Sequence, residues 1–191
     1  MRTSQPQTIY LSDYKVPAYL VDTVELTFEL FEDGARVHST LELRRNPESA
    51  EASAPLELDG DSLKLESVAL DGAKLAASDY EDRGDQLVIR SVPDQFCLTI
   101  VTWIEPQNNT RLEGLYKSSG MFCTQCEAEG FRCITYFPDR PDVMARFRTR
   151  IEASKDAYPI LLSNGNDVER GELERGRHFV TWEDPYPKPC Y

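Results

Sequence analysis

The feature of this sequence that most constrains its fold is a strict alternation of apolar and polar residues. Every second residue from Val24 to Leu30 is apolar, and the residues between them are Glu or Thr. A period of two residues is typical of a strand that buries one face. The pattern stops at the turn-forming pair Asp33 and Gly34 and resumes over residues 37–43. The two segments are therefore predicted to form a β-hairpin.

Short alternating segments and turns continue along the chain. Asp-Gly pairs at 59–60 and 71–72 and an Asn-Gly pair at 164–165 are turn signals. The other β-prone segments are residues 63–68, 87–89, 96–104, 134–137, 147–151, 160–162 and 178–182. One helical turn is predicted over residues 139–143, where an early proline follows an N-capping aspartate. Because no long window shows the apolar stripe of an amphipathic helix, the sequence predicts an all-β sandwich or a large curved sheet.

The length of 191 residues suits one large domain, and no linker or repeat divides the chain, so residues 1–191 are predicted to form a single all-β domain. The C-terminal residues stop just as an aromatic segment begins, which predicts that the chain is cut from a longer protein. The charge of −12 and the pI near 4.6 disfavour nucleic acid as a partner.

The location of the protein is predicted from its N-terminus and its cysteines. The N-terminal residues lack the apolar run of a signal peptide, and no later stretch approaches the ~20 apolar residues that span a bilayer. The five cysteines are an odd number, which fits free thiols in a reducing compartment. We expect a cytoplasmic protein without a membrane partner.

The stretch CTQCEAEG, residues 123–130, admits several kinds of chemistry. Its two cysteines have zinc-knuckle spacing and Cys133 adds a third sulfur, but tetrahedral zinc sites generally need four ligands and both histidines are distant in sequence. Redox chemistry is disfavoured because neighbouring carboxylates stabilise the thiol over the thiolate. Buried or unreactive thiols are the favoured interpretation, so no metal ligand is predicted in this chain.

The acidic residues of the same stretch suggest another role. If residues 125–129 are extended, Gln125, Glu127 and Glu129 project to one side and suit a cation with several N–H donors, such as an α-ammonium group. A solvated acidic edge explains the same spacing, and the spacing does not choose between Glu127 and Glu129. No catalytic motif is present, and structural roles are favoured for His38 and His178.

Several spaced motifs together resemble a known family. The segments LEGLY at 112–116, CTQCEAEG at 123–130, YFPDRPDV at 136–143 and LLSNGN at 161–166 resemble the N-terminal domain of bacterial aminopeptidase N, a family of zinc-dependent gluzincin metallopeptidases. The resemblance covers residues 14–191. It implies an all-β, saddle-like N-terminal domain that packs on a thermolysin-like catalytic domain. That domain, which holds the zinc and the general base in the family, is absent from this chain.

The resemblance also implies roles for particular residues. By position, Gln125 and Glu127 correspond to the family's substrate-anchoring pair, in which the acid accepts from the substrate α-ammonium group and the amide shapes the pocket for the first side chain. It further implies a cis peptide bond between Glu127 and Ala128. The expected partners are therefore peptides with a free N-terminus and the catalytic domain of the same protein. The alternatives are a non-catalytic β-sandwich binding module and a small zinc-knuckle protein.

Overall fold

The fold consists almost entirely of β-strands, as the alternation predicts. A computed structural model describes residue 8, residues 10–51 and residues 53–191. The first seven residues, which belong to the stretch that lacks a signal-peptide pattern, lie outside the described residues. The strands are β1 Tyr19–Leu30, β2 Ala35–Arg45, β3 Leu56–Asp59, β4 Lys64–Leu70, β5 Ala73–Lys74, β6 Tyr80–Asp82, β7 Gln86–Ile89, β8 Gln95–Ile104, β9 Gly114–Ser118, β10 Met121–Gln125, β11 Ala145–Ser154, β12 Asn166–Glu172 and β13 Arg177–Lys188.

The helical structure in the described residues is limited to short 3₁₀ turns. These turns are η1 Leu11–Asp13, η2 Pro106–Asn108, η3 Phe131–Cys133 and η4 Glu174–Gly176. The predicted fold class, an all-β protein with at most short helical turns, is confirmed.

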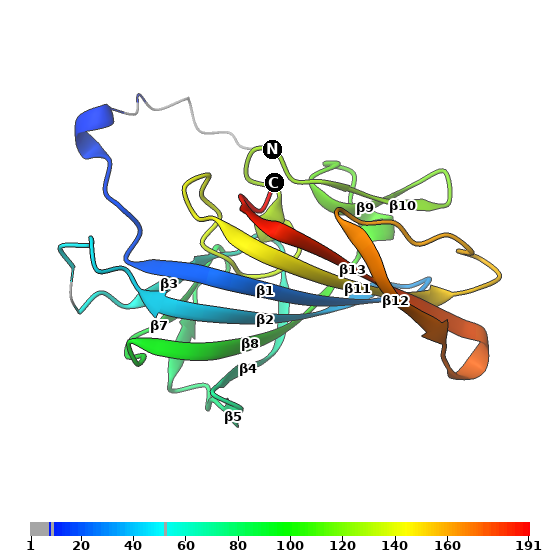
Figure 1. Cartoon of the computed structure of the whole chain (residues 1–191), viewed down its shortest axis with the longest axis horizontal. Coiled ribbons are helices and arrows are strands. Elements are labelled where there is room, and N and C mark those ends of the chain that lie inside the picture. The colour runs from blue at the N-terminus through cyan, green and yellow to red at the C-terminus, as the bar shows by residue number, and fades with distance from the viewer. Residues whose placement is uncertain (1–7, 9, 52) are drawn as a thin grey trace.

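One large sheet runs through the molecule, with strand order β12-β13-β11-β1-β2-β8-β4-β5. Its β1 and β11 are parallel, and the other paired strands are antiparallel. The long strands twist across the molecule in a saddle-like sheet (Figure 1). The strands β3, β7 and β6 form a small second sheet, and β9 and β10 form a separate hairpin.

The first hairpin shows how the sequence pattern becomes a buried face. The apolar residues Val24, Leu26, Phe28 and Leu30 are all buried, as predicted. Before them, however, the buried positions are Tyr19 and Val21. The pairing register with β2 shifts between Val21 and Thr23. Such a β-bulge contains one extra residue, so the inward-facing side chains change from odd-numbered to even-numbered positions.

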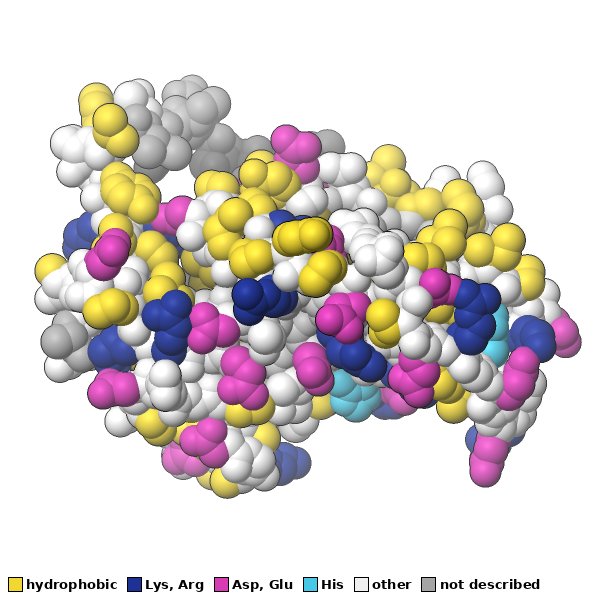
Figure 2. Space-filling view, viewed as in Figure 1, with side chains coloured by type: hydrophobic (Ala, Val, Ile, Leu, Met, Phe, Trp, Pro, Cys, Tyr) yellow, Lys and Arg dark blue, Asp and Glu magenta, His cyan; other side chains and the backbone are white. Residues whose placement is uncertain are grey.

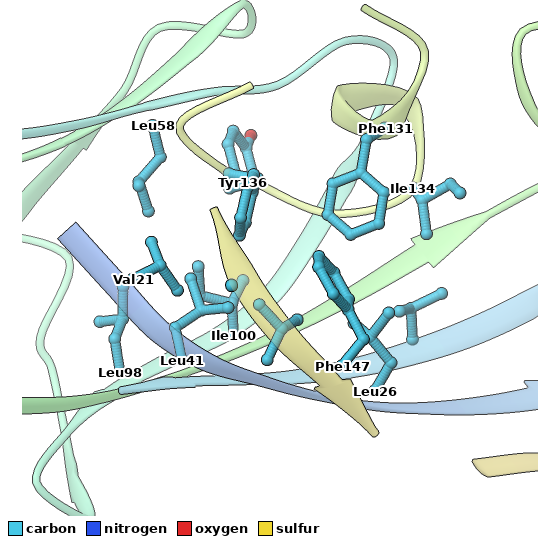
Figure 3. Packing of buried hydrophobic residues seen from close by; sticks show 14 of the residues in the cluster. Val21, Leu26, Leu41, Leu58, Leu98, Ile100, Phe131, Ile134, Tyr136 and Phe147 are labelled. Atoms are coloured by element: carbon cyan, nitrogen blue, oxygen red, sulfur yellow. The ribbon is translucent and has the colours of Figure 1, made fainter. Parts of the chain in front are cut away.

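The core lies between the large sheet and a layer formed by the small sheet and the segment after η3. In Figure 3, Leu58, Phe131, Ile134 and Tyr136 lie opposite side chains of the large sheet. The Phe131 ring contacts the Phe147 ring of β11 edge to face, with 6.2 Å between centroids. Tyr136 has no exposed surface, and its hydroxyl donates to Asp82 at 2.9 Å. Residues 131–137 therefore form part of the second layer, which packs against the large sheet.

Three predictions of local structure are wrong. Residues 134–137 form one isolated bridge, between Phe137 and Asp59, instead of a strand. Their apolar side chains are buried because η3 turns them into the core. Residues 139–143 contain a single turn, closed by the Val143 N–H and the Arg140 carbonyl at 3.2 Å, without helix.

Residues 160–162 also form no strand, although their side chains alternate between core and surface. Leu161 is buried, whereas Ile160 and Leu162 are about three-quarters exposed at 73% and 72%. The Leu161 carbonyl accepts from the indole Nε1 of Trp182 at 3.2 Å. Nearby, Nε2 of the buried His178 lies 2.8 Å from the carbonyl oxygen of Tyr158. The segment is therefore attached to β13 through side chains.

Candidate functional site

The stretch that the sequence singles out lies where β10 ends and a tight turn begins. Strand β10 ends at Gln125, and residues 127–130 form a turn closed by the Gly130 N–H and the Cys126 carbonyl at 2.8 Å. Residues 125–129 are therefore not extended as a whole, so the condition for Gln125, Glu127 and Glu129 to project to one side is not met. A β-carbon at Gly130 would lie 2.5 Å from the Gln125 carbonyl oxygen, so the turn requires a glycine at this position.

The turn places Gln125 and Glu127 together at one rim. The amide Nε2 of Gln125 donates to the backbone carbonyl of Glu127 at 3.2 Å. The peptide bond between Glu127 and Ala128 is cis, as the resemblance implies. Both side chains are exposed. Among the described residues, the Glu127 carboxylate has no hydrogen-bond or ion-pair partner, so its charge is available to a ligand.

Glu129 has a different environment from Glu127. Its Oε1 lies 3.6 Å from Nη2 of Arg132 in η3, so Glu129 is exposed but ion-paired within the chain. The described residues that line the neighbouring groove include Gln125 and Glu127, and Glu129 is not among them. The structure thus separates the two acids that the spacing left equivalent.

The groove beside this rim has a volume of about 610 Å³ and a mainly apolar floor. Side chains of β1 and β11, including Phe28 and Phe147, form the floor. The hairpin β9–β10 and the segment after β11 form the walls, where the rings of Phe122 and Tyr158 pack 5.1 Å apart. Hydrophobic side chains gather along this edge of the molecule (Figure 2). The arrangement can accommodate apolar groups beside one free negative charge.

The wall formed by residues 158–162 was not foreseen as part of the site. Ile160 and Leu162 line the groove while remaining exposed. The sequence feature that could have indicated this wall is the short apolar run after Pro159. We interpreted that run as a strand because of its alternation. An exposed apolar pair of this kind is more typical of an interaction surface than of a strand in a monomeric sheet.

Two cysteines near the turn, Cys126 and Cys133, are protonated at neutral pH. Burial raises the pKa of the Cys126 thiol to about 12 and that of Cys133 to about 11. All five cysteines are free thiols. Because the thiolate is the nucleophile, neither residue suits redox chemistry. The described residues also bring together no group of three or more His, Cys, Asp or Glu side chains able to hold a metal ion.

The fold and the groove define an all-β domain that presents two polar side chains at the rim of an apolar cleft. A sequence profile of the Peptidase M1 N-terminal domain matches residues 20–191, and the chain belongs to this family. The family identified by resemblance is thereby confirmed.

The curated relatives that this chain matches are considerably longer proteins. Aminopeptidase N of Caulobacter vibrioides is 50% identical over 191 residues, which are 100% of this chain and 22% of that protein. Aminopeptidase N of Escherichia coli K12 is 50% identical over 189 residues, which are 99% of this chain and 21% of that protein. The chain therefore spans about a fifth of the length of these relatives.

Solved structures share the fold of this chain. Aminopeptidase A of Legionella pneumophila, in complex with aspartic acid, matches with a TM-score of 0.90 and 37% identity, over 95% of this chain and 21% of that chain. An M1 zinc metallopeptidase mutant of Deinococcus radiodurans, bound to a Tyr-Ser-Ala substrate, matches with a TM-score of 0.74 over 90% of this chain and 40% of that chain. At 16% identity, the second match shows the shared fold.

Location and membrane contact were predicted from the sequence. Across the described residues, none of the helices has the length and apolar character needed to cross a bilayer. The cytoplasmic location stays a prediction.

Proposed function

We propose that this chain is the N-terminal substrate-anchoring domain of a zinc aminopeptidase that removes single amino acids from peptide N-termini. Membership of the M1 family and the likeness to proteins named aminopeptidase N support the proposal. The observation that carries it is the exposed carboxylate of Glu127, which has no partner among the described residues and lies at the rim of an apolar groove.

In this proposal, Glu127 accepts hydrogen bonds from the α-ammonium group of the substrate. Charge-assisted hydrogen bonds are about twice as strong as neutral ones, so a free amino terminus is favoured over a neutral group. Gln125, whose amide is held by its bond to the Glu127 carbonyl, shapes the pocket for the first side chain. An internal peptide bond offers no charge to Glu127, which accounts for cleavage at the N-terminus alone.

The catalytic domain of the same protein supplies the zinc and the general base. The described residues do not fit a zinc site, because they bring together no group of three or more His, Cys, Asp or Glu side chains able to hold a metal ion. The role proposed for this chain is to bind and orient the substrate, and no bond-breaking step is assigned to it.

We further propose that the catalytic domain packs against the groove. The exposed apolar residues Met121, Ile160 and Leu162 line it, and leaving such a surface in water is unfavourable. The relatives are long enough to supply a covering domain, since this chain accounts for about a fifth of their length. Packing there places Glu127 at the boundary between the two domains.

The experiment that tests the proposal is the substitution Glu127→Gln in the full-length enzyme. Hydrolysis of alanine p-nitroanilide is expected to lose about 10- to 150-fold in kcat/KM, which corresponds to ~1.5–3 kcal/mol for a hydrogen bond to a charged group. Glu25→Gln, at an exposed position of β1, is the matched control and is expected to leave kcat/KM unchanged. Unchanged kinetics in Glu127→Gln would remove the anchoring role.

A further inference from the structure

A buried carboxylate, Asp139, is bonded to the segment that follows the Glu127 turn. Asp139 is 3% exposed. Its Oδ2 accepts from the backbone N–H of Arg132 at 3.1 Å and from Nε of the same residue at 3.0 Å. The backbone carbonyl of Asp139 accepts from Nη2 of Arg132 at 3.1 Å. Three hydrogen bonds thus attach the start of η3 to a single residue.

The Arg132 guanidinium extends this attachment into the turn itself. Its Nη2 lies 3.6 Å from Oε1 of Glu129, which is two residues after Glu127. The same nitrogen lies 3.6 Å from Oδ2 of Asp59 at the end of β3. The Arg132 side chain is 18% exposed and its planar donors are rigid, whereas the Glu129 side chain that it contacts is 46% exposed. The turn is therefore held at Glu129 by a side chain that Asp139 fixes.

Asp139 is in turn fixed by the small sheet. Its backbone N–H donates to Oδ2 of Asp59 at 3.2 Å. Two residues earlier, Phe137 and Asp59 exchange both backbone hydrogen bonds, at 2.8 and 3.1 Å. A continuous path of bonds consequently runs from β3 through Asp139 and Arg132 to the turn.

The second carboxylate oxygen of Asp139 faces the C-terminal segment. Its Oδ1 accepts from the thiol of Cys190 at 3.0 Å, and Cys190 lines the same groove as Glu127. Burial raises the pKa of the Cys190 thiol, so the thiol stays protonated and can donate this hydrogen bond. With one oxygen bonded to Arg132 and the other to Cys190, Asp139 connects two segments at the groove.

We propose that Asp139 is a positioning residue, which holds the turn through Arg132 and thereby fixes Glu127 at the rim of the groove. The proposal rests on the anchoring role of Glu127 given above. The carboxylate of Glu127 has no partner among the described residues, so its position depends on the backbone that carries it. A binding group that is held in place before the substrate arrives avoids an ordering cost on binding.

Whether Asp139 and Arg132 stabilise the 126–130 turn can be tested in this chain without any substrate. The N–H of Gly130, which closes the turn on Cys126, reports its opening by amide hydrogen exchange. In Asp139→Asn, exchange at Gly130 is expected to accelerate about tenfold or more, while amides in the middle of β1 and β2 keep their rates. Arg132→Lys, which keeps the charge and loses the planar donors, is expected to accelerate it as well.

A matched control lies in the next turn. Asp142 makes a similar pair with Arg140, at 2.9 Å to Nε and 2.6 Å to Nη2, and makes no recorded contact with the 126–130 turn among the described residues. Asp142→Asn is expected to leave exchange at Gly130 within about twofold. Unchanged exchange in both Asp139→Asn and Arg132→Lys, or an equal acceleration in Asp142→Asn, would overturn the proposal.

A double-mutant cycle in the full-length enzyme separates positioning from general stability. Asp139→Asn is expected to lower kcat/KM about tenfold when Glu127 is present, and by less than about twofold when Glu127→Gln is already in place. An equal loss in both backgrounds, or no loss in either, would rule out action through Glu127. If Glu127→Gln alone has no effect, the anchoring function fails, and the exchange experiment still decides whether Asp139 holds the turn.

Discussion

Gly114 and Gly130 lie against each other where the β9–β10 hairpin meets the Glu127 turn. A β-carbon on Gly114 would lie 3.0 Å from the carbonyl oxygen of Gly130, and one on Gly130 would lie 3.1 Å from the nitrogen of Gly114. Gly114 also has a φ of +71°, which favours glycine. Two residues without side chains thus allow the backbone of the hairpin to approach the turn that presents Gln125 and Glu127.

Gly130→Ala is therefore expected to destabilise the domain by about 1–3 kcal/mol, because the new methyl group overlaps backbone atoms that have no room to move. Urea unfolding measures the loss. Gly72→Ala is the control: a β-carbon there meets nothing within 4 Å, and its φ of +79° leaves a backbone penalty of about 1 kcal/mol. Equal losses in the two variants would show that the backbone around Gly130 has room for a β-carbon.

The sequence predicts those parts of the fold that depend on local pattern. The alternation from Val24 to Leu30 is sufficient for the first hairpin, because strand pairing and burial of one face follow from the same period. The turn after Gln125 was missed because it depends on the close approach of Gly130 to the Gln125 carbonyl oxygen and to Gly114, which the alternation of apolar and polar residues does not report. The difference between Glu127 and Glu129 depends on the tertiary placement of Arg132, so spacing alone left the two acids equivalent.

Cys126 and Cys133 are expected to resist alkylation in the folded chain. Burial raises their pKa values to about 12 and about 11, so almost no thiolate is present at pH 8. Native protein treated with iodoacetamide and then digested should show both residues unmodified by mass spectrometry. The same treatment in urea should modify both, which serves as the control. Rapid alkylation of either residue in the native chain would contradict the burial on which the interpretation depends.

Glu66 is expected to make stability depend on pH in the acidic range. Its Oε2 accepts from Nε of Arg36 at 2.8 Å, and this bond lowers the pKa of Glu66 below its ordinary value of 4.5. Because the pKa of Glu66 is lower in the folded state, the bond contributes fully to the unfolding free energy at pH values above the unfolded-state pKa. This contribution is lost as the pH falls through the folded-state pKa. The pair is about one-third exposed, so we expect about 0.5 kcal/mol.

The measurement for Glu66 is the difference in unfolding free energy between the wild type and Glu66→Gln. The difference is expected at pH 7 and should decrease as the pH falls below 4.5, and it should vanish once the pH is below the folded-state pKa, where the carboxyl is protonated in both states. Glu25→Gln, at an exposed position without a recorded partner among the described residues, should show no such dependence. A difference that grows as the pH falls would reverse the sign and refute the assignment.

The isolated chain is expected to lack peptidase activity, with or without added zinc. Catalytic zinc sites use three protein ligands and an open position for water. The described residues bring no three potential ligands together, and the thiols of Cys126 and Cys133 are protonated at neutral pH. Alanine p-nitroanilide incubated with the purified chain and zinc should be hydrolysed no faster than in buffer. The full-length enzyme at equal concentration is the positive control, and appreciable turnover by the chain alone would place catalytic groups within these residues.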